Sequence, residues 1–185
     1  MAFIGLRKPY VAKYNKAQKT YSDGFRYAHA ISVNITPNYT EASLYGDDVQ
    51  TEYDKEFVNA AVSFGSTHTP IDAASTMFGH TVDGDNVKYK TTDEANYVGL
   101  GFIAPEKIDG EKKFVGLVVL CAKFTDPGDD FATKGDQIQY KTPTIDGLAV
   151  AADDEGNWKE TEKFDTEAEA AAFVCNKLNI EIPSA

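Results

Sequence analysis

Two stretches decide the fold of this chain: Tyr97-Val-Gly-Leu-Gly-Phe-Ile-Ala104 and Phe114-Val-Gly-Leu-Val-Val-Leu-Cys-Ala-Lys-Phe124. Both are apolar at consecutive positions, which is typical of strands that are covered on both faces. Asp109-Gly110 stands between them and is a hairpin turn signal. We therefore expect two central antiparallel strands. Gly99 and Gly101 lie within the first strand, where we expect them to relieve packing.

Half-buried strands are predicted outward from this pair. In His29–Thr36 the residues Ile31, Val33 and Ile35 alternate with Ser32, Asn34 and Thr36, which is the period of a strand with one core face. The same pattern predicts a second core face, formed by Val58, Ala60, Val62 and Phe64. Further strands are expected over Gln137–Thr142, Ile145–Val150 and Trp158–Phe164, with turns at Asp83-Gly84 and Asp153–Asn157.

Two short helices interrupt the strands. Thr69-Pro70 is a start signal with Gly79 as the stop, and Thr166 with Glu169 forms a capping box ahead of a stop at Asn179. The expected apolar stripes are Ile71, Ala74, Met77 and Phe78 in the first helix, and Ala168, Ala171, Ala172, Cys175 and Leu178 in the second. The predicted fold class is mainly β with short flanking helices, arranged as a β-sandwich or partly closed barrel.

Composition predicts one folded domain over residues 1–185, because 42% of the residues are apolar and 12% are aromatic. The net charge of −11 argues against tight binding to nucleic acid, which depends on clustered Lys and Arg. The charge is uneven: residues 1–26 hold six basic side chains and one acidic, net +5, whereas residues 126–169 hold 13 acidic and 4 basic, net −9. Such asymmetry either reflects solvated surface or favours self-association.

The segment Pro37–Glu56 is a long polar hairpin with a Gly46-Asp47-Asp48 turn at its middle. It has few residues that could pack against a core, so its ordering in an isolated subunit is costly. We expect it to be mobile unless a partner holds it.

No catalytic constellation is visible, and we expect neither an enzyme nor a cofactor or metal. The histidines are scattered, and no nucleophile elbow, phosphate-binding loop or dinucleotide fingerprint is present. The acidic turns Asp83–Asp85 and Asp126–Asp130 lack the ligand spacing of a calcium loop. Cys121 and Cys175 lie in apolar runs, which predicts buried free thiols. The longest apolar run, Phe114–Ala122, is too short for a membrane helix. The apolar stretch at the start of the chain is too short for the core of a signal peptide. We therefore expect a soluble intracellular protein that does not associate with a membrane.

A series of short motifs, in order along nearly the whole chain, resembles the major tail tube protein of long-tailed, non-contractile bacteriophages. The matching features are Gly5-Leu-Arg-Lys-Pro-Tyr10, Ala42-Ser-Leu-Tyr-Gly-Asp-Asp48 with Glu52, the Val58–Phe64 strand, the helix that ends at Gly79, the strand that ends at Phe124, Thr142-Pro-Thr-Ile-Asp-Gly147, Gly156-Asn-Trp158 and Phe164-Asp-Thr166 with Ala168.

The resemblance implies a structural virion protein with a β-sandwich or barrel, six copies of which form a ring. Rings stack into a tube that conducts the genome, an extended hairpin reaches between rings, and the lumen is electronegative. It also implies a tape-measure protein and tail terminator or tip proteins as partners, DNA that passes without specific binding, and a location in the virion tail after assembly in the host cytoplasm.

Three sets of residues are predicted to serve this assembly. The ring-stacking hairpin would act through Leu44, Tyr45, Asp47, Asp48, Glu52 and Tyr53. An N-terminal arm, residues 1–21, would contact another subunit through Arg7, Lys8, Lys13 and Lys16. The lumen would be lined by Ser32, Asn34, Thr36, Asn59 and Ser63, with negative charge from Glu41, Glu52, Asp54 and Glu56.

Two other functions stay open at this point. A monomeric β-sandwich binding module, for carbohydrate or surface adhesion, would present an aromatic platform, for which Tyr10, Tyr14, Tyr21 and Tyr27 are candidates. A tube subunit of a phage-tail-like bacteriocin shares the same physics. The polar face assigned to the lumen could also be ordinary outer surface.

Overall fold

The two apolar stretches form the long central strands of the domain, β7 and β8, which pair antiparallel with Pro105 opposite Phe114. The computed structural model describes residues 3–108, 110–133 and 140–181. Its elements are β1 (Arg7–Asn15), β2 (Thr20–Arg26), β3 (Ala30–Gly46), β4 (Val49–Ser66), α1 (Ile71–Thr76), β5 (Thr81–Asp83), β6 (Asn86–Lys88), β7 (Tyr97–Ile108), β8 (Glu111–Phe124), β9 (Thr144–Ala149), β10 (Lys159–Phe164) and α2 (Glu167–Lys177).

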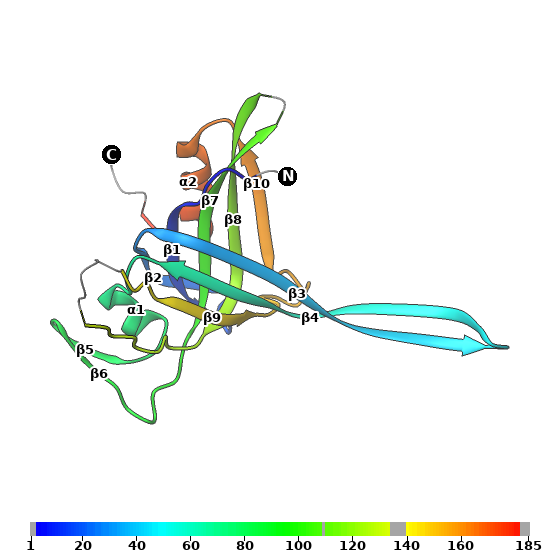
Figure 1. The fold of residues 1–185 in the computed structure, drawn as a ribbon, viewed down its shortest axis with the longest axis horizontal. Helices are drawn as coiled ribbons and strands as arrows, with labels where there is room; N and C mark the ends of the chain where they lie inside the picture. Colours follow the sequence, from blue (N-terminus) through cyan, green and yellow to red (C-terminus); the bar gives the residue numbers. More distant parts are fainter. Residues whose placement is uncertain (1–2, 109, 134–139, 182–185) are drawn as a thin grey trace.

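Eight strands form one antiparallel sheet in the order β2-β1-β7-β8-β9-β4-β3, with β10 paired to β8 as well. One edge of β8 is shared, because β10 pairs with Phe114–Val119 and β9 pairs with Ala122–Phe124. From β9 onward the sheet turns away, so that β3 and β4 cross over β1, β7 and β8 (Figure 1). The expectation of a mainly β fold with two short helices is confirmed, but the strands within the described residues form no closed barrel.

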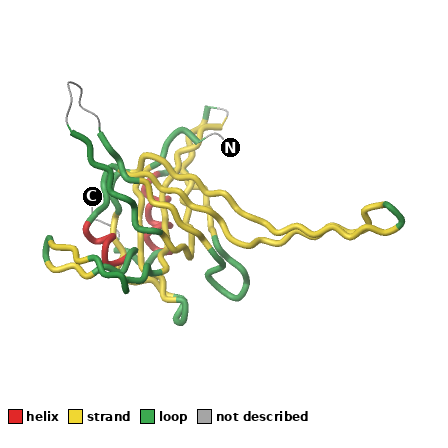
Figure 2. The backbone as a smooth tube through the Cα atoms, turned by 60° about the horizontal axis from the view of Figure 1, so that its bottom comes forward, coloured by secondary structure: helices red, strands yellow, loops and turns green. Residues whose placement is uncertain are grey.

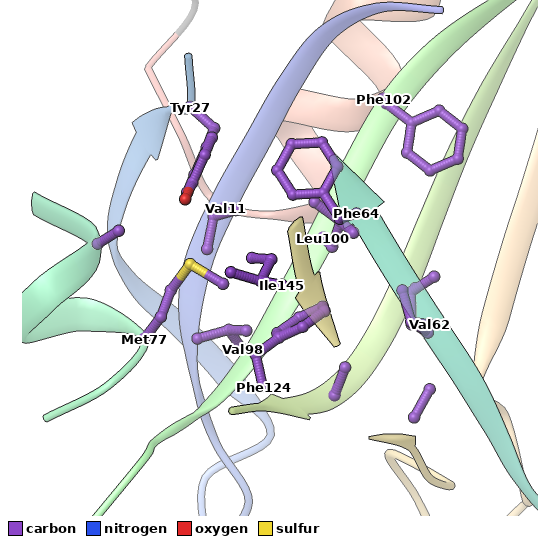
Figure 3. Packing of buried hydrophobic residues seen from close by; sticks show 14 of the residues in the cluster. Val11, Tyr27, Val62, Phe64, Met77, Val98, Leu100, Phe102, Phe124 and Ile145 are labelled. Atoms are coloured by element: carbon purple, nitrogen blue, oxygen red, sulfur yellow. The ribbon is translucent and has the colours of Figure 1, made fainter. Parts of the chain in front are cut away.

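The main core lies between the two parts of this folded-over sheet. It joins Val62 and Phe64 of β4 to Val98 and Leu100 of β7, and Tyr27 meets Phe64 edge to face at 5.1 Å (Figure 3). Met77, at the end of α1, closes one end of this cluster. Burial of these side chains holds the crossing strands together without backbone pairing between β2 and β3.

Helix α2 covers the opposite face of β1, β7 and β8. Its start is the capping box expected from Thr166 and Glu169, and Asn179 beyond its end has a left-handed φ of 52°. The buried side is Ala170, Ala171, Val174, Cys175 and Leu178, so the expected stripe was wrong at Ala168, which is exposed. Gly99 and Gly101 of β7 lie directly beneath Leu178 and Val174, which confirms their packing role.

Several local expectations at the other end of the domain need small corrections. Helix α1 begins one residue later than expected, with Pro70 at the N-cap and no side-chain cap from Thr69. The predicted hairpin at Asp83-Gly84 is confirmed as β5–β6. The expected strand Gln137–Thr142 falls partly outside the described residues, and residues 140–142 belong to no strand. Both cysteines are buried free thiols, as predicted.

No helix in the described part of the chain is long and apolar enough to cross a membrane.

Candidate functional site: the β3–β4 hairpin and its polar face

The dominant surface feature is the outer half of the β3–β4 hairpin, which projects far from the domain (Figures 1 and 2). The two strands pair from Ala30 opposite Ser66 to Gly46 opposite Val49, so the segment Pro37–Glu56 is part of one antiparallel ladder, whose register shifts at three places. At the tip, Asp47 and Asp48 have φ values of 51° and 62°. Two successive left-handed residues make the tight turn whose twist suits a hairpin.

Two β-bulges change which side chains face the core. Ile31 and Val58 are extra residues in the β3–β4 register, because Ala30–Ser32 is opposite Ser66–Gly65 and Asn38–Tyr39 is opposite Asn59–Phe57. Each is 52% exposed, so the expectation that both belong to the core face was wrong. Between Val58 and the tip of the hairpin, the alternation of β4 is shifted by one residue. Phe57 therefore faces the core.

The first face of the hairpin continues the outer surface of the sheet. The predicted lumen residues Ser32, Asn34, Thr36, Asn59 and Ser63 all lie on this face, away from the core. Farther out, Glu56, Asp54 and Glu52 are opposite Thr40, Ala42 and Leu44 and therefore share the same face. The polar face thus runs from neutral amides and hydroxyls near the body to carboxylates toward the tip.

Glu41 does not belong to this polar face. It is opposite Lys55 on the other side of the hairpin, and the Lys55 Nζ lies 2.6 Å from its Oε1. The hydrogen bond from Lys55, with a second from Tyr53, holds the pKa of Glu41 below its usual value. Alternation along β3 from Ser32 and Asn34 already places Glu41 on the opposite side, so its assignment to the lumen rested on its charge and not on the strand pattern. The bulge at Val58 decides only that Lys55 is its cross-strand partner.

The second face of the hairpin is aromatic. Tyr39, Tyr45 and Tyr53 lie along it and are 47%, 65% and 52% exposed. At its base, Phe57 stacks on Trp158 with ring centroids 5.0 Å apart and planes 15° apart. This stack joins the base of the hairpin to the start of β10, because Trp158 precedes Lys159. Sequence reasoning did not identify Trp158 as the anchor of the hairpin.

Next to the polar face, the strands β3, β4 and β9 form a shallow hollow of about 370 Å³. It is lined in part by Asn34, Thr36, Ser63 and Asp146, with the 49% exposed Leu148 beside them. Lys123 of β8 is opposite Leu148 and brings a positive charge to the margin of this face. Neither Leu148 nor Lys123 was predicted to lie here.

The predicted N-terminal arm is largely part of the sheet. Residues 7–15 form β1, which lies between β2 and β7, so they are not an extended arm. Arg7 and Lys8 both pair with Glu167 of α2 at 2.7 and 3.0 Å, and Lys19 pairs with Asp154 at 2.7 Å. The basic start and the acidic last third therefore meet within one chain, where the sequence suggested a contact between copies.

Lys16 is the exposed member of the predicted arm that faces an aromatic ring, with its Nζ 4.4 Å from the Tyr97 centroid. Lys13 lies in β1 opposite Val98 and lines a surface hollow with Asp23 and Asp72. Contact of these two lysines with another subunit stays a prediction.

The aromatic platform of the alternative binding module is not formed by the candidates named for it. Tyr10, Tyr14 and Tyr27 are 3%, 6% and 2% exposed, and Tyr21 donates its hydroxyl proton to the Leu120 carbonyl at 2.8 Å. Burial raises the pKa of Tyr10, Tyr14 and Tyr27, which agrees with a role in the core.

No protein-family profile matches the chain, and no curated protein is significantly similar to it. Within residues 3–108, 110–133 and 140–181, no group of three or more His, Cys, Asp or Glu side chains could hold a metal ion.

Proposed function

We propose that the chain is a structural subunit that assembles into hexameric rings, which stack into a tube of the phage-tail type and conduct a genome. The observation that carries the proposal is the β3–β4 hairpin, whose outer half is exposed on both faces. A two-faced projection with Tyr39, Tyr45 and Tyr53 on one side is suited to packing against another protein, and its mobility before assembly stays a prediction. The role is non-catalytic, and the same geometry would serve a phage-tail-like bacteriocin tube.

The open edge of the sheet supports self-association. β3 is an edge strand of 17 residues, and its outer side has no paired strand in the described structure. Such an edge offers free N–H and C=O groups to another chain. A heterologous contact that closes gives a ring, and one that repeats along an axis gives a filament.

The polar face supports the assignment of a channel wall. Ser32, Asn34, Thr36 and Asn59 offer hydrogen bonds to water without positive charge, and Glu52, Asp54 and Glu56 add negative charge. Phosphates that meet such a wall stay hydrated, because no counterions are released by binding. Lys123 places a positive charge at the margin of the polar face. We therefore expect another subunit to cover this margin in the tube, so that Lys123 does not face the channel.

The assembly is tested by negative-stain electron microscopy and sedimentation velocity of the purified chain at increasing concentration. The matched variant removes residues 40–56 and joins Tyr39 to Phe57 by Asn-Gly, which keeps the base of the hairpin paired. We expect rings and tubes from the intact chain, and a folded domain without tubes from the variant. A chain that stays monomeric at high concentration would refute the assembly, and tubes from the shortened variant would refute the role of the hairpin.

The channel wall is tested in virions by the double variant Asn34→Lys and Asn59→Lys. Both side chains lie on the polar face, so tubes should form while genome delivery slows or stops. Normal delivery, or a tube structure with these residues on the outside, would contradict the assignment.

A further inference from the structure

His80 lies between two carboxylates that come from segments far apart in the sequence. Its Nδ1 is 2.8 Å from Asp93 Oδ2 and its Nε2 is 3.0 Å from Asp126 Oδ2. The side chains of His80 and Asp93 are 9% and 10% exposed, whereas that of Asp126 is 43% exposed. The proposed assembly does not use this group of three side chains.

The Asp93 side of the bridge is held firmly. The Lys90 N–H donates to the same Oδ2 of Asp93 at 2.8 Å, which fixes the carboxylate. The loop that carries Asp93 is attached to the end of α1, because the Asn96 N–H donates to the Met77 carbonyl at 2.8 Å and the Asn96 side chain donates to the Ser75 and Thr76 carbonyls at 3.1 Å.

Fewer hydrogen bonds hold the Asp126 side of the bridge. The Thr125 N–H donates to the Asp146 carbonyl at 2.8 Å, and after this bond residues 126–133 belong to no helix or strand. Among the described residues, the carboxylate of Asp126 has His80 as its hydrogen-bond partner. Gly128, two residues on, has open space at the position of a Cβ, and the next side-chain contact that holds this stretch is the ion pair of Asp130 with Lys141 at 2.8 Å.

The geometry sets the protonation state of the ring. Each imidazole nitrogen that faces a carboxylate needs a proton to donate, so both bonds together require the imidazolium form. Burial acts to lower the pKa of His80, but the hydrogen bonds to Asp93 and Asp126 outweigh it, and the pKa lies above its ordinary value of 6.5. The other groups that face this site are the Tyr89 ring, 4.4 Å from the His80 ring, and Lys123 of β8, which lines a surface hollow together with His80, Asp93 and Asp126.

We propose that protonated His80 is a pH-sensitive latch, which holds the segment beginning at Asp126 against the Asp93 loop and releases it when the ring loses its proton. A neutral ring keeps one N–H, and the bond to the buried, doubly hydrogen-bonded Asp93 retains it. Nε2 then presents a lone pair to the carboxylate of Asp126, and the two groups separate. The latch does not depend on assembly of the chain.

The pH range follows from the two shifted groups. The pKa of His80 is raised on folding. Its contribution to the stability of the closed latch is therefore complete below the ordinary value of 6.5 and is lost as the pH rises through the raised value. Because hydrogen bonds from His80 and the Lys90 backbone lower the pKa of Asp93, its contribution is present above the ordinary value of 3.8 and is lost as the pH falls through the lowered value. The latch is therefore closed between about pH 4 and 6.5 and opens as the pH rises through the raised pKa of His80.

NMR on the full chain tests the latch. Ring ¹⁵N shifts report the protonation of His80. Amide hydrogen exchange at Thr125, expressed as its protection factor, reports the release of the segment that begins at Asp126, because the Thr125 N–H donates to the Asp146 carbonyl directly before it. We expect protection to fall about tenfold across the titration of His80, as for the loss of one hydrogen bond to a charged group. Asp126→Asn should shift this titration to lower pH and remove the pH dependence of protection. Asp130→Asn is the matched control, since Asp130 pairs with Lys141 and not with His80.

Each outcome of this experiment either supports or overturns the proposed latch. A protection factor of Thr125 that does not change across the titration of His80 would overturn the proposal, as would an unchanged titration in Asp126→Asn. A neutral ring in the closed state, seen directly in the ¹⁵N shifts at pH 6, would overturn it as well. Equal effects of Asp126→Asn and Asp130→Asn would show that any charge in this stretch acts alike, and would refute a specific latch.

Discussion

Replacing Gly99 by alanine should destabilise the domain, because helix α2 packs onto the bare backbone of β7 at this residue. An added Cβ would lie 2.5 Å from Leu178 Cδ2 and 2.6 Å from Tyr21 Cε1. Both side chains would have to retreat by about 1 Å to reach ordinary carbon–carbon contact. Neither moves freely, since Leu178 is fully buried and the Tyr21 hydroxyl is bonded to the Leu120 carbonyl.

Two opposing contributions set the size of the effect. Overpacking of a filled site costs about 1–3 kcal/mol, whereas alanine in a strand interior is favoured over glycine by about 0.5–1 kcal/mol. The midpoints of these two ranges give an expected net loss of about 1 kcal/mol in the free energy of unfolding, or a melting temperature lower by about 2–4 °C for a domain of this size.

Urea denaturation followed by tryptophan fluorescence measures this difference, with Gly128→Ala as the control. No heavy atom lies within 4 Å of the Cβ position at Gly128, so this variant should stay within about 0.5 kcal/mol of the parent. A Gly99→Ala chain as stable as the parent would refute the close packing of α2 on β7.

Two further substitutions test the base of the hairpin and the charges that meet within the chain. Trp158→Ala removes the stack on Phe57, so it should lower the free energy of unfolding by about 1–2 kcal/mol and speed amide exchange at the hairpin base. Trp158→Phe keeps an aromatic ring there and should retain most of the stability and of the slow exchange. Equal exchange in the two variants would contradict the role of Trp158 as the anchor. Glu167→Gln should cost about 0.5–1 kcal/mol at pH 7, because Glu167 accepts from Lys8 and Arg7. The hydrogen bond from Lys8, followed by that from Arg7, lowers the pKa of Glu167, so the contribution is present above its ordinary value of 4.5 and is lost in acid. Urea denaturation of parent and variant should therefore differ at pH 7 and converge as the pH falls through the lowered pKa of Glu167. A difference that persists below that pKa would refute the ion-pair origin.

The sequence alone determined the features that depend on neighbours a few residues apart. Three local features are the capping box at Thr166 and Glu169, the turn predicted at Gly46-Asp47-Asp48 and the doubly buried strands β7 and β8. They follow from the sequence because turn geometry, capping and side-chain periodicity are set within one turn or one strand. The alternation of β3 also placed Ser32, Asn34 and Thr36 on one face, since no bulge interrupts them.

Only the tertiary structure decided which distant groups meet. A bulge shifts a strand by one residue without changing its composition, so the exposure of Val58 and the pairing of Glu41 with Lys55 could not be read from the alternation. Net charge along the chain suggested a contact between copies, whereas the fold places β1 beside α2 and pairs Arg7 and Lys8 with Glu167 inside one chain. His80 and Asp126 are 46 positions apart and meet because burial of the whole core brings their segments together. The local sequence around either residue does not predict this contact.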